Sequence, residues 1–186
     1  MIAGLGNPGP EYVGTRHNVG FRVIDSLASA LKIDVGKKKF GACFGLGRIQ
    51  AGSNEKLILL KPQQFINRSG QVVATAAGFY RVGVDKLFVV TDDMALEPGS
   101  IRIRAKGSAG GHKGLADVIE KLGTEDVARL RIGIGQCGED TAYDYVLDKP
   151  TEAEGKLLDE AIEMAREAVI CWVKYGVEKA MNDFNN

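Results

Sequence analysis

The stretch MIAGLGNPGPEYVGTRHNVGFRVIDSLASAL, residues 1–31, contains a strand, a loop and a helix in succession. Residues 1–5 have the length and the apolar character of a buried strand. Glycine and proline then dominate a loop, and apolar side chains at spacings of three and four predict a helix over Val19–Leu31. A strand that leads through a loop into a helix is the unit from which α/β sheets are built, so this stretch decides the fold class.

The remaining sequence continues this alternation. Further strands are predicted at residues 43–49, 56–61, 87–91, 100–104 and 129–135, and further helices at Ser69–Tyr80, Lys113–Leu122 and residues 151–181. The last helix begins with a capping-box sequence, in which Thr151 could cap the amide of Glu154. We therefore expect one domain over residues 1–186, an α/β sandwich with a twisted, mixed, largely parallel sheet and helices on both faces.

Composition excludes several classes of protein. Hydrophobic residues make up 45% of the chain and charged residues 26%, as in ordinary globular proteins. No apolar run is long enough to span a bilayer and no signal-peptide pattern precedes the first strand, which predicts a cytoplasmic protein without membrane contact. Cys43, Cys137 and Cys171 lie far apart and only two histidines are present, so we expect reduced thiols and no zinc site.

The formal net charge is zero, but the charges are unevenly distributed. Residues 1–70 contain ten lysines and arginines against four acidic residues, whereas residues 132–186 contain five against twelve. A neutral total can therefore conceal a basic surface of the kind that binds a polyanion.

The glycines of the first loop also match the dinucleotide fingerprint G-x-G-x-x-G at residues 4–9. That fingerprint requires a helix to begin within the glycines, so that its first N–H groups meet a pyrophosphate. Pro8 and Pro10 oppose a helix at this point. We therefore favour a tight turn at the end of the strand over a nucleotide-binding oxidoreductase.

Polar loops follow three predicted strands, and a fourth leads into a helix. They contain Asn7, residues 61–67, the pair Asp92-Asp93 and residues 107–114. In parallel sheets such loops meet at the carboxyl edge of the strands and form a cleft. His17 lies in a polar, glycine-rich loop, and histidine is the side chain that exchanges a proton near neutral pH. The sequence therefore predicts a cleft in which His17 is the candidate base.

Several long motifs, in order and spacing, resemble the bacterial-type peptidyl-tRNA hydrolase family over nearly the whole chain. They are G-L-G-N-P-G with T-R-H-N-V-G-F, K-P-x-x-F-x-N-x-S-G at 61–70, L-E-P-G after the Asp-Asp pair, G-S-A-G-G-H-x-G at 107–114, R-L-R-I-G-I-G at 129–135 and D-Y-V-L at 144–147. The resemblance implies an enzyme that hydrolyses the ester between a peptide and the 3′ end of tRNA. It also implies a monomer that needs no metal or cofactor.

The resemblance assigns roles to individual residues. His17 would activate water, and Asp92 would orient His17. Asn7 and Asn67 would position the 3′ end and the peptide, and the cleft would be lined by Tyr12, Ile66 and His112. A neutral imidazole can accept a proton from water, and a carboxylate on its other nitrogen fixes the tautomer. Asp93 is the alternative carboxylate, and the packing of a helix N-terminus is the alternative role of His112.

Basic residues on two predicted strands are the candidates for tRNA contact. Arg102 and Arg104 share one face of a strand by alternation, and so do Arg129 and Arg131. Further cations follow at Lys106, Lys113 and Lys121. Such side chains would meet phosphates without reading bases. The alternative is a charged strand edge that only prevents aggregation.

Three positions depart from the family pattern. Lys113 stands where the usual residue is Asn, Ala95 where it is Asp, and Ile66 where it is Met. Ile66 keeps an apolar wall, whereas Lys113 introduces a cation that we expect to meet a tRNA phosphate. A carboxylate of the protein, Asp92 or Asp93, is the alternative partner of Lys113. The family also has plant relatives that act in RNA splicing, so RNA binding without catalysis is the alternative function.

Overall fold

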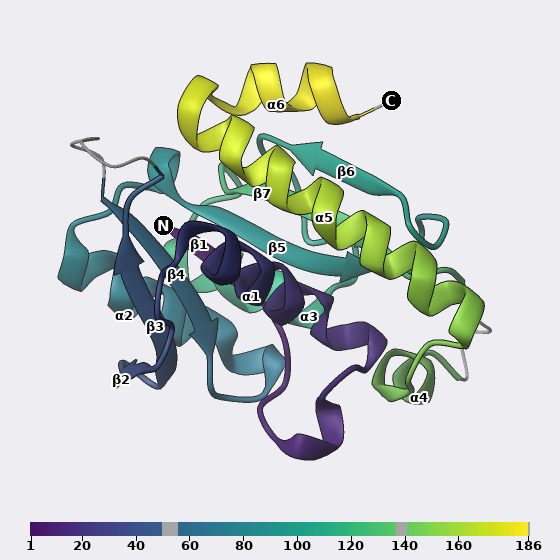
Figure 1. Cartoon of the computed structure of the whole chain (residues 1–186). Helices are drawn as coiled ribbons and strands as arrows, with labels where there is room; N and C mark the ends of the chain where they lie inside the picture. Colours follow the sequence, from purple (N-terminus) through teal and green to yellow (C-terminus); the bar gives the residue numbers. More distant parts are fainter. Residues whose placement is uncertain (50–55, 137–140, 186) are drawn as a thin grey trace.

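The computed structural model describes residues 1–49, 56–136 and 141–185, and its strands and helices alternate along most of the chain (Figure 1). The strands are β1 (Ile2–Gly4), β2 (Lys37–Lys39), β3 (Ala42–Gly47), β4 (Leu57–Pro62), β5 (Phe88–Asp93), β6 (Ile101–Arg104) and β7 (Ala128–Gly133). The α-helices are α1 (Val19–Leu31), α2 (Ser69–Tyr80), α3 (Lys113–Leu122), α4 (Ala142–Leu147), α5 (Glu152–Tyr175) and α6 (Val177–Phe184). Of the three cysteines, Cys43 and Cys171 are free thiols, and Cys137 lies outside the described residues.

The seven strands form one sheet in the order β2-β3-β4-β1-β5-β7-β6. The four central strands β4, β1, β5 and β7 are parallel. β3 runs antiparallel to β4 at one side, and β6 runs antiparallel to β7 at the other. The predicted α/β fold with a mixed sheet is therefore confirmed. The strands predicted at residues 43–49 and 100–104 correspond to β3 and β6, which supply antiparallel pairs at opposite sides of the sheet and do not pair with each other.

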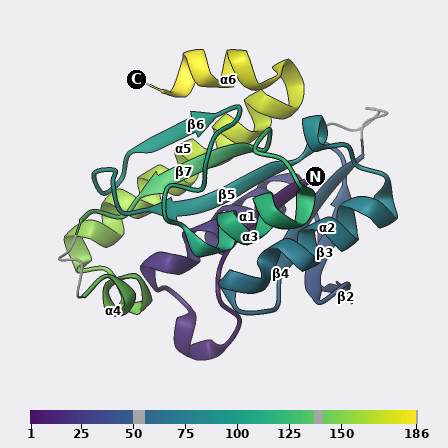
Figure 2. The ribbon, with the colours of Figure 1, turned by 180° about the vertical axis from the view of Figure 1, so that it is seen from behind.

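Alternating apolar residues give the central strands two buried faces. In β5, Phe88 and Val90 point to one hydrophobic core, whereas Val89 points to the other. Helices α1, α5 and α6 cover the first face, which is the front of Figure 1. Helices α2 and α3 cover the second face, seen from behind in Figure 2. Strands buried on both faces explain the continuous apolar runs of the sequence.

Two glycines allow α1 to pack directly on β1. A Cβ atom at Gly4 would lie 2.2 Å from the carbonyl oxygen of Gly20, and one at Gly20 would lie 2.4 Å from that of Leu5. The loop after β1 forms the short 3-10 helix η1 (Pro10–Tyr12), and α1 begins only at Val19. No helix begins within the glycines, so their role is the close approach of helix and strand rather than the binding of a pyrophosphate.

The predicted helix over residues 151–181 is wrong as a single element. Its capping box forms, with Thr151 Oγ1 accepting the N–H of Glu154 at 3.3 Å. The helix ends at Tyr175, however, because Gly176 adopts φ 87° and ψ 175°, and α6 then begins at Val177. Strand β2 and helix α4 were not predicted, since three consecutive lysines and a six-residue helix give no clear periodicity.

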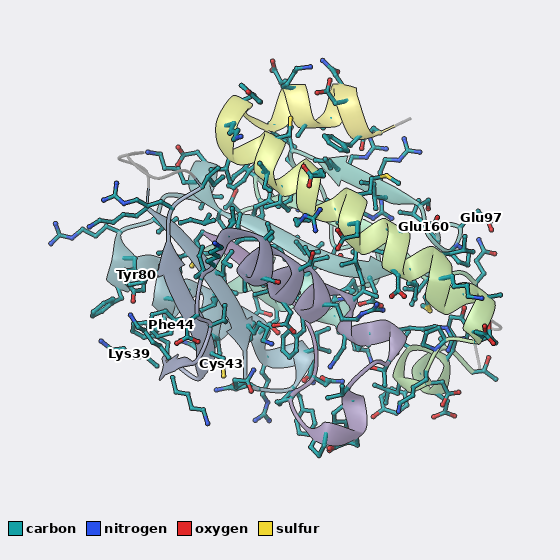
Figure 3. All side chains as sticks on the ribbon, viewed as in Figure 1. Lys39, Cys43, Phe44, Tyr80, Glu97 and Glu160 are labelled. Atoms are coloured by element: carbon teal, nitrogen blue, oxygen red, sulfur yellow. The ribbon has the colours of Figure 1, made fainter. Side chains whose placement is uncertain are left out.

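The two outer edges of the sheet are protected in different ways. β2 exposes Lys37, Lys38 and Lys39, and charged edge strands resist pairing with other chains. Behind it, the rings of Phe44 and Tyr80 lie 6.1 Å apart, at the side of the molecule where Figure 3 labels them. At the opposite edge, the side chain of Asn185 accepts the N–H of Ile103 at 2.7 Å and donates to its carbonyl at 3.0 Å.

No helix in the described ranges is both long and apolar enough to cross a membrane.

Candidate active site

Asp92 lies inside a strand rather than in the loop that the sequence predicted. β5 continues to Asp93 because its ladder with β7 extends that far, pairing Asp92 with Ile132 and Asp93 with Gly133. The Asp92 residue is 4% exposed. A buried strand therefore fixes the carboxylate at the carboxyl edge of the sheet.

His17 reaches this carboxylate from the turn before α1. It belongs to the 3-10 helix η2 (Arg16–Asn18), and its Nδ1 lies 2.8 Å from Oδ1 of Asp92. A carboxylate can only accept, so Nδ1 carries the proton and Nε2 of a neutral His17 keeps its lone pair. The side chain is 14% exposed, which is compatible with a base that a water molecule can reach.

His112 binds the same carboxylate oxygen, and its ring lies next to that of His17, with the two ring centroids 5.4 Å apart. Its Nε2 lies 3.0 Å from Oδ1 of Asp92, while its Nδ1 accepts the backbone N–H of Leu115 at 3.0 Å and caps α3. The cap requires an unprotonated Nδ1, so the proton of a neutral His112 is on Nε2 and points to Asp92. His112 therefore does two things at once. It caps the N-terminus of α3, and it donates a hydrogen bond to Asp92.

The two histidines control the ionisation of Asp92. Burial alone would raise the pKa of this carboxyl group, but the charges of His17 and His112 and their hydrogen bonds outweigh that effect. The pKa of Asp92 is consequently well below its usual range. The carboxylate is ionised at neutral pH although it is buried.

Within the described part of the chain, His17, Asp92 and His112 form the group that could hold a metal ion, since their ligand atoms lie within 4.8 Å of one another. A histidine bound to a metal through Nε2 normally carries its proton on Nδ1. In His112 that proton would face the N–H of Leu115, so the helix cap would have to break. The hydrogen bond from Leu115 to Nδ1 of His112 therefore disfavours a metal at this position.

Asn7 is held by a residue that the sequence analysis did not select. Asn18 accepts the backbone N–H of Asn7 at 2.8 Å and donates to its carbonyl at 3.0 Å. The side-chain oxygen of Asn7 accepts the N–H of Ile66 at 2.8 Å. Among the described residues the Nδ2 group of Asn7 has no acceptor, which makes it available to a ligand. The position of Asn18 directly after His17 was the one signal for its role.

The predicted wall residues come from two loops. The rings of Tyr12 and Phe65 meet edge to face at 6.3 Å, and Phe65 is 58% exposed. Ile66 is buried against Gly114, where an added Cβ would come within 2.8 Å of Ile66 Cγ1. Asn67 follows in the short helix η3 (Ile66–Arg68), and its side chain is exposed.

A basic pocket of about 180 Å³ adjoins His112 on the α3 side of the sheet. Its cations come from β6, the loop after β6, and β7, namely Arg104, Lys106, Arg129 and Arg131. Arg131 forms an ion pair with Asp93, and the buried Arg129 donates to the carbonyl of Gly107 at 2.7 Å. Burial and then the charge of Arg131 lower the pKa of Arg129. Figure 2 shows β6 and β7 beyond α3 on this face.

Three predicted tRNA contacts therefore gather, and two do not. Arg104, Lys106 and Arg131 line the basic pocket. Arg102 binds the carbonyl of Asn185, and Lys121 pairs with Glu120 on α3. The basic excess of residues 1–70 does not build this pocket either, because all its cations lie between positions 104 and 131.

Lys113 begins α3 with an exposed side chain. It forms no ion pair among the described residues, since Asp92 binds the two histidines and Asp93 binds Arg131. The alternative that Lys113 meets one of these carboxylates is therefore wrong.

The fold and the site define an α/β protein with a histidine–aspartate pair of the kind that hydrolytic enzymes use. A sequence model of the family described as peptidyl-tRNA hydrolase matches residues 1–186. The chain therefore belongs to the peptidyl-tRNA hydrolase family, which confirms the resemblance found in its motifs.

Individual relatives agree with this assignment. The peptidyl-tRNA hydrolase of Caldanaerobacter subterraneus subsp. tengcongensis is 49% identical over 185 residues, covering 100% of this chain and 98% of that protein. That of Desulforamulus reducens is 50% identical over 185 residues, covering 100% and 88%. A crystal structure of peptidyl-tRNA hydrolase from Acinetobacter baumannii matches with a TM-score of 0.93 at 38% identity, covering 99% of this chain and 93% of that one.

Proposed function

We propose that this protein hydrolyses the ester bond between a peptide and the 3′-terminal ribose of tRNA. The family supports the substrate class. The observation that carries the chemistry is the 2.8 Å hydrogen bond between His17 Nδ1 and Asp92, because it leaves Nε2 of His17 as a base. Ester hydrolysis by water needs such a base, a donor for the oxyanion and a means of holding the ester.

In the proposed reaction, Nε2 of His17 accepts a proton from water while the water oxygen attacks the ester carbonyl. Asp92 stays ionised and stabilises the imidazolium that forms. The Nδ2 group of Asn7 donates to the oxyanion of the tetrahedral intermediate. The C–O bond to the ribose then breaks, and the leaving oxygen takes the proton from His17. The products are a peptide carboxylic acid and a free tRNA hydroxyl.

The surrounding side chains would hold the two halves of the substrate. Tyr12, Ile66 and Asn67 flank the proposed oxyanion donor and are suited to the peptide and the terminal nucleotide. His112 would hold Asp92 in place through its hydrogen bond to Oδ1. It contacts the carboxylate directly, so we assign it to positioning rather than to proton transfer.

The tRNA backbone would bind along the basic pocket. Arg104, Lys106 and Arg131 offer cations beside His112 for phosphate groups, without base-specific contacts. Lys113 lacks a carboxylate partner among the described residues and lies next to the site, so we assign it to a phosphate near the 3′ end. Arg102 and Lys121 already have protein partners, and we assign them weaker, peripheral contacts.

We further propose that the protein acts as a metal-free monomer in the cytoplasm, where peptidyl-tRNA arises, and that residues 1–186 form one domain. The hydrogen bond from Leu115 to His112 supports the metal-free mechanism.

Release of free tRNA from purified peptidyl-tRNA tests the proposal. Wild-type protein should release tRNA, and His17→Ala should lower kcat by about 10²- to 10⁴-fold, the usual contribution of a general base. Binding of tRNA should change little in this variant. Binding without hydrolysis by the wild-type protein would favour the RNA-binding alternative, and near-wild-type turnover by His17→Ala would overturn the role of His17.

A further inference from the structure

Arg16 precedes His17 in η2, and its guanidinium is buried rather than solvated. The residue is 5% exposed, although arginine rarely lies inside a protein without partners. It is not a candidate for contact with tRNA, because its side chain points into the C-terminal part of the chain.

The guanidinium forms several hydrogen bonds to the segment of residues 145–154. Nη1 donates to the carbonyl oxygens of Tyr145, Asp148 and Lys149 at 3.3, 3.4 and 3.1 Å. Nη2 donates to Oε2 of Glu154 at 2.8 Å. The guanidinium carbon also lies 4.2 Å from the ring centroid of Tyr145. A planar fork of donors can satisfy several acceptors together, whereas a lysine ammonium cannot reproduce this arrangement.

The segment that Arg16 binds is itself anchored. The Tyr145 hydroxyl donates to the carbonyl of Ile134, directly after β7, at 2.6 Å. Glu154 belongs to the capping box of α5, where Oε2 also accepts the N–H of Thr151 at 2.8 Å. Both attachments lie on packed elements of the fold. Arg16 therefore connects the turn that carries His17 to two rigid points.

The backbone makes the same connection. The N–H of Arg16 donates to the carbonyl of Asp148 at 3.1 Å, so the main chain and the side chain of Arg16 both bind the same segment. The next residue along the chain is the proposed base. A shift of the Arg16 backbone would move His17 relative to Asp92.

We infer that Arg16 is a positioning residue, which with Glu154 holds η2 so that His17 keeps its hydrogen bond to Asp92. The inference rests on the proposed role of His17 and adds the device that orients it. Neither Arg16 nor Glu154 contacts the substrate in this arrangement. Their removal should affect turnover and the His17 ring, and should leave tRNA affinity unchanged.

Two variants test the inference. Arg16→Lys keeps the charge but loses the fork, and Glu154→Gln keeps an acceptor for Thr151 but loses the charge that faces Arg16. Both should lower kcat, by about ten- to a hundred-fold for Arg16→Lys, with KM nearly unchanged, because small displacements of a catalytic group have effects of this size. Glu154→Gln should have a smaller effect and is the variant expected to fold normally, since Glu154 is partly exposed.

Thr151→Ala is the matched control. It removes the side-chain cap of α5 and the hydrogen bond from the Thr151 hydroxyl to Oε2 of Glu154, but it leaves both partners of the Arg16–Glu154 ion pair present. It should keep wild-type kcat at a temperature where it is folded. A loss of kcat in Thr151→Ala equal to that in Glu154→Gln would show that destabilisation of this region alone lowers kcat. That result would overturn the inference.

Nuclear magnetic resonance gives a readout that does not depend on activity. The chain has two histidines, so the ring signals of His17 and His112 can be followed separately. Arg16→Lys and Glu154→Gln should shift the ring signals of His17 more than those of His112, which binds the same oxygen of Asp92. Wild-type kcat and unchanged His17 signals in both variants would overturn the inference. If His17→Ala itself remained active, the proposed role of His17 would fail instead, and if the wild-type protein released no tRNA, the proposed function would fail.

Discussion

The Nδ1 atom of His112 accepts the backbone N–H of Leu115 at 3.0 Å. This one contact fixes the helix start and the tautomer of the ring together. Because Nδ1 is an acceptor, the ring must present Nε2–H to the carboxylate of Asp92. The cap of α3 thus determines which ring nitrogen of His112 donates to Asp92.

Two substitutions at His112 should separate these tasks. Asn can cap a helix, so His112→Asn should keep most of the stability, whereas His112→Ala should unfold with a free energy lower by about 0.5–2 kcal/mol. Both remove the hydrogen bond to Asp92, so both should lower kcat to a similar extent. Urea denaturation and single-turnover hydrolysis check the pair. Equal stability of the two variants would show that the cap contributes little.

Asp92 and Asp93 should give opposite kinetic signatures. Asp92→Asn can favour the wrong imidazole tautomer of His17, so it should reduce kcat strongly while the protein stays folded. Asp93 binds Arg131 in the basic pocket, so Asp93→Asn should act on KM and leave kcat near the wild-type value. Steady-state kinetics with peptidyl-tRNA decide the order. A larger loss of kcat in Asp93→Asn would identify Asp93 as the orienting carboxylate.

The lowered pKa of Asp92 also predicts how stability depends on pH. A carboxyl group whose pKa is lower in the folded state stabilises the protein above its unfolded-state value, about 3.9, and loses this contribution as the pH falls toward the folded-state value. The free energy of unfolding should therefore fall more steeply below about pH 4 in the wild type than in Asp92→Asn. Urea titrations between about pH 2 and pH 6 measure this difference. Parallel curves throughout would contradict the shift.

The basic pocket should determine how tRNA affinity responds to salt. Each phosphate contact that is removed should flatten the plot of log affinity against log salt by about one unit. Arg104→Gln and Lys106→Gln should each show this change. Lys121→Gln is the control, because Lys121 pairs with Glu120 outside the pocket. An equal change in all three slopes would mean that the pocket has no special role.

Lys113 should act on substrate affinity rather than on the chemical step. Lys113→Asn restores the family residue and removes a cation that has no carboxylate partner in the described part of the chain. KM should rise and become less sensitive to salt, and kcat should hold or increase. Titration of KM over a range of salt concentrations provides the measurement. A loss of kcat at unchanged KM would instead assign Lys113 to the reaction itself.

Much of the fold followed from local patterns in the sequence. Helices α1, α2 and α3 have the predicted limits, because apolar periodicity and polar boundaries agree there. The break at Gly176 was missed since the apolar stripe continues through it on both sides. Strand β2 depends on pairing with β3 rather than on its own lysine-rich sequence, so no local signal could identify it.

The site was only partly predictable for a similar reason. Motifs drew attention to His17, Asp92 and His112, but the sharing of one carboxylate oxygen is a relation between three elements that lie far apart in the sequence. Arg16 and Asn18 flank His17 and were passed over. Their importance comes from partners more than ten residues away, which a single sequence does not connect.

The side-chain amide of Asn185 makes the two hydrogen bonds to Ile103 of β6 that a neighbouring strand would make. It occupies the outward N–H and carbonyl of Ile103, the two groups that a strand of another molecule would use to extend the sheet. Asn185→Asp would retain an acceptor and lose the donor, leaving that carbonyl open. We expect this variant to hydrolyse its substrate normally and to aggregate on storage. We therefore expect resistance to aggregation to depend on a side chain that has no part in the proposed chemistry.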